Sequence, residues 1–247
     1  MRFIFLLLAF FIFVVPSVAA DTSQPYTIAC YHIPLLVDDE DHGAFIELFK
    51  EAARRAEIHY TMRLVPAKRA MRYFEDGDVV GILPALQSTL ALDAALTRQI
   101  FSKQVHTFVR SGDPIPKTVG SLEGKRIGLT RGFGYPRAIT MNENIDVDYA
   151  DTTEGSLMKL LEGRIDAVVA DGYTALYAIE KMELSGFHYD LSAILDEQPV
   201  YMAFQPTDEG RELARKISRA LAAMEADGTV AKILPDITGK YRRQGAD

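Results

Sequence analysis

Asp171 has the clearest position for ligand chemistry in this sequence. It follows the apolar run AVVA and precedes Gly172, so it stands where a predicted buried strand ends and the next helix begins. Open α/β sheets bind their ligands at the carboxyl ends of their strands, and an ionised carboxylate accepts hydrogen bonds from a ligand there. The same carboxylate would also serve as the N-cap of the following helix. The sequence allows both roles for Asp171.

The glycine-rich loop RGFGYP, at residues 131–136, is a second candidate for ligand contact. It leads into a predicted helix, and the free N–H groups at a helix N-terminus can receive an anion. Gly132 and Gly134 would allow the backbone to approach a ligand closely, and Phe133 would supply an apolar wall. A simple turn between a strand and a helix is the alternative interpretation.

Arg69 and Tyr31 are candidates because of their places next to predicted elements. Arg69 lies in the first turn after Pro66, where neighbouring basic residues predict a charged rim to a cleft. A solvated helix face is the alternative for Arg69. Tyr31 lies toward the end of the first strand, which is predicted within residues 26–37, and ordinary core packing is its alternative.

No motif for covalent or metal chemistry accompanies these candidates. The five histidines are scattered without metal-ligand spacing, and the single cysteine, Cys30, lies in an apolar strand pattern typical of a buried, unreactive thiol. The G-x-S-x-G nucleophile motif is absent, and GLTRGFG lacks the third glycine and the acidic partner of a dinucleotide loop. We therefore expect no catalytic residue, no metal and no cofactor.

The candidate residues are positioned by a unit that the chain contains twice. Residues 70–85 and 156–171 both have the pattern of an amphipathic helix, a glycine stop and a buried strand. Predicted strands and helices alternate around both copies, which indicates parallel sheets covered by helices on two faces. The sequence therefore predicts an α/β protein of two similar lobes. A cleft between lobes usually holds a small molecule.

Two segments with strand-like alternation, residues 104–109 and 199–204, are expected to link the lobes as a hinge. The predicted first lobe comprises residues 21–110 and 200–247, and the second comprises residues 111–199. Near the end of the chain, DEGRELARKISRALAAMEADG predicts an amphipathic packing helix.

The first twenty residues and the net charge limit the location and the partners. Residues 1–20 combine Arg2, an apolar run of thirteen residues, Pro16 and small residues before Asp21, which is typical of a cleaved signal peptide. The net charge is −7, and the chain has no basic cluster that would track a phosphate backbone. We therefore expect an exported, periplasmic protein that does not bind nucleic acid.

Several motifs occur in a characteristic order along the chain. They are the first-helix pattern from Gly43 to Ala56, Pro66, Arg69, Gly77, LEGKRIGLTRG at 122–132, GRIDAVVAD at 163–171 and MEADGTVAKI at 224–233. In this order they resemble the family 3 extracellular solute-binding proteins, which have the type II periplasmic binding fold. The resemblance covers almost the whole chain after the signal peptide, with departures at Ala44 and Phe45.

The resemblance implies where a ligand would bind. Polar amino-acid binders of this family clamp the ligand carboxylate with an arginine shortly after the third strand, because a guanidinium matches a carboxylate bidentately. The spacing puts Ala95 at that position, and Arg98 lies one helical turn away as a candidate replacement. The family's hydroxyl residue is missing from the loop at 132–134. Asp171 matches the aspartate that holds the ligand ammonium group.

The implied function is the capture of a small polar solute, amino-acid-like or a carboxylate, by a monomer that delivers it to an ABC transporter membrane permease. Two alternatives remain. In the first, the closed lobes dock on a membrane sensor instead of a permease. In the second, the protein is an enzyme similar to the cyclohexadienyl dehydratases, for which Glu154 and Asp171 would be the acids.

Overall fold

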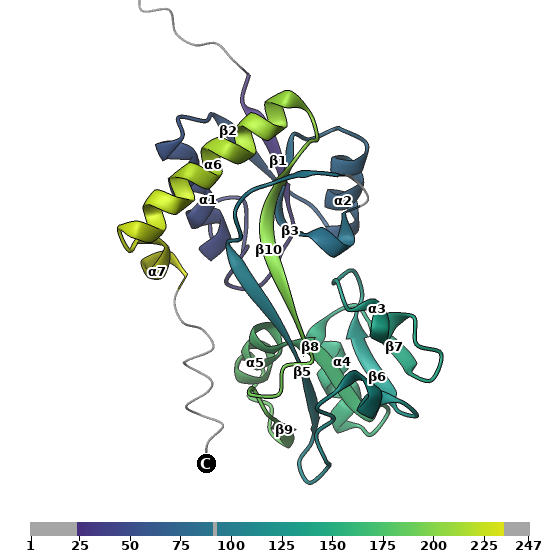
Figure 1. The fold of residues 1–247 in the computed structure, drawn as a ribbon. Coiled ribbons are helices and arrows are strands. Elements are labelled where there is room, and N and C mark those ends of the chain that lie inside the picture. The colour runs from purple at the N-terminus through teal and green to yellow at the C-terminus, as the bar shows by residue number, and fades with distance from the viewer. Residues whose placement is uncertain (1–23, 91–92, 235–247) are drawn as a thin grey trace, which may run out of the picture.

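Two α/β lobes joined by a pair of long strands make up the structure (Figure 1). The computed structural model describes residues 24–90 and 93–234, so the predicted signal peptide lies outside the described residues. One mixed sheet passes through both lobes, with the strand order β2 (Tyr60–Leu64), β1 (Tyr26–Cys30), β3 (Gly81–Leu86), β10 (Asp196–Phe204), β5 (Phe101–Arg110), β8 (Ala167–Asp171), β6 (Arg126–Thr130) and β7 (Asp146–Ala150). The prediction of an α/β protein with two lobes and a hinge is confirmed.

The first lobe contains three parallel strands and four helices, of which the long helix α6 packs against α1 (Figure 1). Its elements are β1 (Tyr26–Cys30), α1 (Ala44–Arg55), β2 (Tyr60–Leu64), α2 (Ala67–Glu75), β3 (Gly81–Leu86), a 3-10 turn at Gln87–Thr89, β4 (Ala95–Leu96), α6 (Asp208–Ala226) and α7 (Thr229–Ile233). The amphipathic helix expected near the end of the chain corresponds to α6 and is confirmed.

The second lobe repeats this arrangement around the parallel strands β6, β7 and β8. Its elements are a 3-10 turn at Val119–Leu122, β6 (Arg126–Thr130), α3 (Arg137–Thr140), β7 (Asp146–Ala150), α4 (Thr153–Leu161), β8 (Ala167–Asp171), α5 (Gly172–Lys181) and β9 (Phe187–Tyr189). Among the described helices, none has the length and apolar character needed to span a bilayer.

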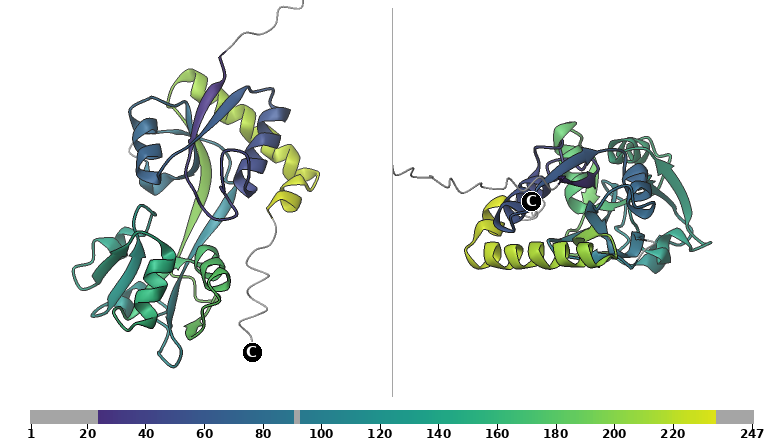
Figure 2. Two further views of the ribbon diagram at one scale, coloured as in Figure 1. Left: turned by 180° about the vertical axis from the view of Figure 1, so that it is seen from behind. Right: turned by 90° about the horizontal axis from the view of Figure 1, so that it is seen from above.

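The lobes are connected by β5 (Phe101–Arg110) and β10 (Asp196–Phe204), which pair with each other in antiparallel fashion. Figure 2 shows these two strands passing between the lobes in the view from behind. β10 also pairs with β3 of the first lobe, and β5 also pairs with β8 of the second. The chain therefore passes from one lobe to the other within two continuous strands. The exact lobe limits at residues 110 and 199 stay a prediction.

The repeated helix-glycine-strand unit is confirmed as α2 with β3 and α4 with β8. Each helix is followed by a glycine with a left-handed backbone, with φ of 78° at Gly77 and 72° at Gly163. Glycine is favoured there because a Cβ atom makes this conformation costly. Every residue of β3 and β8 is buried, as the apolar pattern of both copies predicts.

Two predicted elements differ from the structure. The strand predicted over residues 26–37 ends at Cys30, because Pro34 lacks an N–H for a strand ladder and Leu35 has a φ of 63°. The segment instead forms a loop closed by hydrogen bonds between Ile33 and Val37. The helix predicted after residues 131–136 is only the short helix α3.

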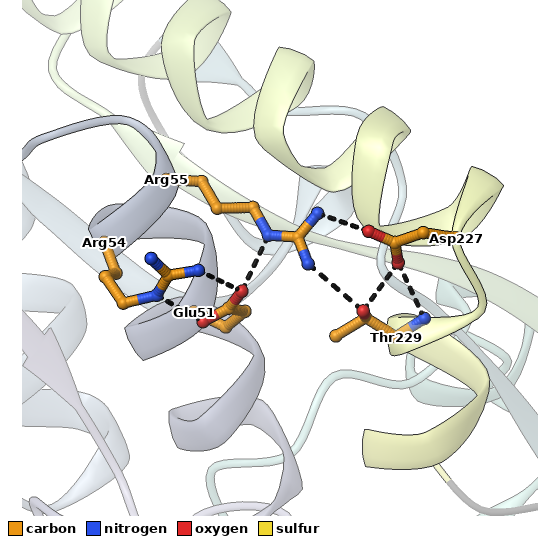
Figure 3. Close-up of polar contacts among 5 residues, drawn as sticks. All are labelled: Glu51, Arg54, Arg55, Asp227 and Thr229. Atoms are coloured by element: carbon orange, nitrogen blue, oxygen red, sulfur yellow. Dashed lines mark hydrogen bonds and ion pairs between the residues drawn. The ribbon is translucent and has the colours of Figure 1, made fainter.

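A polar network links α1 to the C-terminal end of α6 (Figure 3). The guanidinium group of Arg55 donates to Glu51 at 2.7 Å, to Asp227 at 2.6 Å and to the Thr229 hydroxyl at 3.1 Å. Arg54 pairs with Glu51 alone. Arg55 therefore connects segments that are far apart in the sequence, whereas Arg54 only pairs within its own helix.

Replacing Arg55 by alanine is expected to lower the urea midpoint of unfolding, because it leaves Asp227 and Thr229 without their partner on α1. Arg54→Ala is the matched control and should leave the midpoint close to wild type, because an exposed ion pair within one helix contributes little. Equal midpoints for the two variants would contradict a stabilising role for the network.

Candidate functional site

A cavity lies where the two lobes meet the hinge strands. It contains about 490 Å³ of empty space, part of it open to solvent. Its polar lining residues are Tyr31, Lys103, Asp171 and Thr174. The other lining residues are Ile33, Leu36, Phe45, Pro84, Leu86, Phe101, Phe133, Gly134 and Val200. Four predicted site residues therefore come together: Tyr31, Phe133, Gly134 and Asp171.

Asp171 is nine-tenths buried at the end of β8, with an exposed fraction of 9%. Its Oδ1 atom accepts hydrogen bonds from the backbone N–H of Thr174 at 2.9 Å and from the Thr174 hydroxyl at 3.0 Å. These bonds cap α5, which confirms the capping interpretation. No described residue donates to the other oxygen, Oδ2. One carboxylate thus caps the helix and also leaves an acceptor for a ligand.

The loop at 131–136 reaches from the second lobe to the first. A Cβ atom added to Gly134 would lie 2.8 Å from Leu86 Cδ1 and 2.9 Å from Thr89 Cγ2, so a larger residue would have to displace these two side chains of the first lobe. Gly132 has a φ of 85° and lies near Ala67, but it does not line the cavity. The predicted anion contact depends on the dipole of the helix that follows this loop. That helix, α3, has only four residues and forms a single turn, so its dipole gives the contact little support.

Arg98 and Arg69 do not line the cavity. Arg98 forms an ion pair with Glu225 on α6, and its backbone N–H donates to the Ser218 hydroxyl at 2.9 Å. The short strand β4 pairs with the end of β10 and holds this segment against α6. Arg69 is exposed on α2. Neither guanidinium group therefore comes to the cavity in this structure.

Lys103 is the charged cavity residue that the sequence analysis missed. It has an exposed fraction of 8%, and its Nζ atom donates to the carbonyl oxygen of Gly134 at 2.5 Å and lies 5.2 Å from the ring centroid of Tyr135. Burial lowers the pKa of Lys103, while Asp171 and Asp196 act in the opposite direction. The sequence did contain a signal for Lys103, which alternates with the apolar residues Phe101 and Val105 along one strand. A lysine is almost never fully buried unless it is paired.

Burial also controls the two tyrosines near the cavity. It raises the pKa of Tyr31 above its ordinary value and raises the pKa of Tyr135 to about 12. Tyr135 accepts a hydrogen bond from the backbone N–H of Thr130 at 2.9 Å, and no described residue bonds to the Tyr31 hydroxyl. Both phenols therefore stay neutral at physiological pH, and Tyr31 retains a donor for a ligand.

Similar sequences come from bacterial solute-binding proteins, although no protein-family model matches the chain. The histidine-binding periplasmic protein of Salmonella typhimurium is 26% identical over 217 residues, which cover 77% of this chain and 76% of that protein. The putative amino-acid ABC transporter-binding protein PatH of Vibrio harveyi is 30% identical over 132 residues, 51% of this chain and 50% of PatH. The L-cystine-binding protein TcyJ of Escherichia coli is 29% identical over 122 residues, 46% of this chain and 42% of TcyJ.

Solved structures with the same fold cover most of both chains. The GluR0 ligand-binding core of Nostoc punctiforme with L-glutamate has a TM-score of 0.71 and 20% identity, over 85% of this chain and 97% of that one. An ancestral arginine-binding protein bound to arginine has a TM-score of 0.68 and 21% identity, over 85% and 96%. A histidine kinase sensor domain has a TM-score of 0.69 and 18% identity, over 85% and 94%. These similarities confirm the two-lobed fold.

Proposed function

We propose that this chain, which belongs to the family 3 extracellular solute-binding proteins, captures a small amino-acid-like or carboxylate solute between its lobes. The observation that carries the proposal is the cavity between the lobes, which is lined by Asp171, a residue whose Oδ2 atom has no hydrogen-bond partner among the described residues. The relatives named above bind histidine, cystine or other amino acids. An unpaired carboxylate oxygen in a mostly apolar cavity suits the ammonium group of such a solute.

The location and the partner belong to the same proposal. The named relatives are periplasmic or transporter-binding proteins, and we place this chain in the periplasm after removal of residues 1–20. It acts there as a monomer and delivers its solute to an ABC transporter permease.

Two other functions remain as alternatives. A sensory role is a second candidate, because a histidine kinase sensor domain shares the fold. An enzymatic role has less support, since the relatives are binding proteins and Glu154 does not line the cavity.

Thermal unfolding of the exported chain against a panel of amino acids, carboxylates and other polar metabolites tests this function. A ligand at a hundred times its dissociation constant should add about 2.7 kcal/mol to the free energy of unfolding and raise the midpoint accordingly. Analogues that lack the ammonium group serve as controls and should shift the midpoint less. An unchanged midpoint across the whole panel would argue against solute capture.

A further inference from the structure

Lys103 carries a buried charge that the described residues do not neutralise directly. Its ammonium group has three N–H donors, and among the described residues it donates a hydrogen bond only to the Gly134 carbonyl. Lys103 forms no ion pair with a carboxylate among the described residues. Asp171 and Asp196 act on it only from a greater distance. Burying a charge without an ionic partner is costly. An anion that enters the cavity and pairs with Lys103 would reduce this cost.

Gln198 supplies a second unsatisfied group beside Lys103. The two residues are directly paired across β10 and β5, so their side chains lie on the same face of the sheet. Gln198 has an exposed fraction of 8%, and its Oε1 atom is buried without a hydrogen-bond partner among the described residues. It lies 3.9 Å from the position that a Cβ atom on Gly134 would occupy. Buried polar atoms are nearly always paired in native proteins, and these two groups flank the same loop residue beside the cavity.

The charges that line the cavity sum to zero. Lys103 is the cation and Asp171 is the anion of the lining residues, and Phe45, Phe101 and Phe133 are among its apolar walls. A ligand with one ammonium and one carboxylate group would pair with both charges and keep the cavity neutral. A ligand with a second cation would bring that charge against apolar walls, where it would be desolvated without a partner.

We propose that Lys103 is the anion-binding residue of this site, and that Lys103 and Asp171 together select a zwitterion with an apolar side chain. This inference rests on the proposed function and adds the class of solute. Lys103 then takes the carboxylate in place of the absent arginine, and Asp171 Oδ2 takes the ammonium group. The solved arginine-binding protein holds a ligand with a second cation, whereas Asp171 is the sole acid among the residues that line this cavity.

Titration calorimetry of the chain without its predicted signal peptide, residues 1–20, tests the inference with four probes. The probes are L-leucine, L-phenylalanine, L-phenylalaninamide, which lacks the carboxylate, and L-arginine, which adds a second cation. We expect the two apolar amino acids to bind at least tenfold more tightly than arginine. We also expect phenylalanine to bind at least tenfold more tightly than its amide.

The variants Lys103→Met and Lys103→Arg separate recognition of the carboxylate from support of the loop. Lys103→Met should reduce the preference for phenylalanine over its amide to less than about threefold, whereas Lys103→Arg should keep it. A merely structural contact between Lys103 and Gly134 would instead weaken the acid and the amide equally. Circular dichroism and the unfolding midpoint of the free variants check that they fold.

Different results overturn the inference and the proposed function. If arginine binds at least as tightly as the apolar amino acids, or if Lys103→Met keeps the preference for the acid, the inference is wrong while solute capture stands. If neither these probes nor the wider polar panel binds the wild-type chain, both are wrong.

Discussion

Asp171→Asn should bind its solute at least about thirtyfold more weakly than the wild-type chain while keeping a similar unfolding midpoint without ligand. Asparagine retains an Oδ1 acceptor for the backbone N–H and hydroxyl of Thr174, and it caps helices about as well as aspartate. It lacks the negative charge that would pair with a ligand ammonium group. Removing one partner of a buried charged pair costs about 2–5 kcal/mol, which exceeds a factor of about thirty in affinity.

Asp171→Ala is a less clean test of the same role. It removes the helix cap together with the charge, and loss of an N-cap costs about 1 kcal/mol of stability. Alanine is therefore expected to lower the stability of the free fold as well as to weaken solute binding.

Asp146→Asn is the matched control for Asp171→Asn, because Asp146 begins β7, at the opposite end of its strand from the carboxyl end, and pairs with Arg126. It should bind the solute as tightly as wild type. Calorimetric titration of the three proteins with one solute measures the difference. An Asp171→Asn variant that binds like the control would remove Asp171 from the site.

The sequence predicted those parts of the fold and site that depend on local patterns. The repeated helix-glycine-strand unit is visible because left-handed glycines and buried strands have strong local signatures. The position of Asp171 followed from the same pattern, since a strand that ends in a carboxylate has its location fixed by the sheet. Tyr31, Phe133 and Gly134 were identified by their places next to strand ends, and all three line the cavity.

The parts that were missed depend on contacts between distant segments. The direction of Arg98 is set by Glu225 and Ser218, more than a hundred residues away, and by the pairing of β4 with β10. Lys103 was missed because the hinge strand was predicted to begin at residue 104, whereas β5 begins at Phe101. The walls contributed by Ile33 and Leu36 come from a loop that was predicted as strand. Local periodicity carries no information on such packing.

Gly43→Ala should cause the largest loss of stability of any single substitution proposed for this chain, about 3 kcal/mol or more. Gly43 has φ of 119° and ψ of 148°, a region that is essentially restricted to glycine and costs other residues about 1–3 kcal/mol. An added Cβ atom would lie 2.6 Å from the carbonyl oxygen of Leu36 and 2.8 Å from the Cα atom of Val37. Both obstacles are backbone atoms, so no side-chain rotation relieves the clash.

The same substitution should also weaken solute binding, because Gly43 fixes the loop that carries Leu36 to the start of α1. The N–H of Ala44 donates to Leu35 at 2.9 Å and the N–H of Phe45 donates to Leu36 at 2.8 Å. Moving the Leu36 backbone away from a Cβ atom would break these bonds and displace Leu36 and Phe45, which both line the cavity.

Gly77→Ala separates the clash at Gly43 from the general cost of replacing a glycine that has a positive φ. Gly77 has a φ of 78° and no atom within 4 Å of an added Cβ, so its cost should be the backbone term of about 1–2 kcal/mol alone. Urea unfolding of both variants measures the difference. If Gly43→Ala loses no more stability than Gly77→Ala, the prediction is wrong. The loop would then move to accommodate the added methyl group, and its hydrogen bonds to the start of α1 would not hold the Leu36 backbone rigidly.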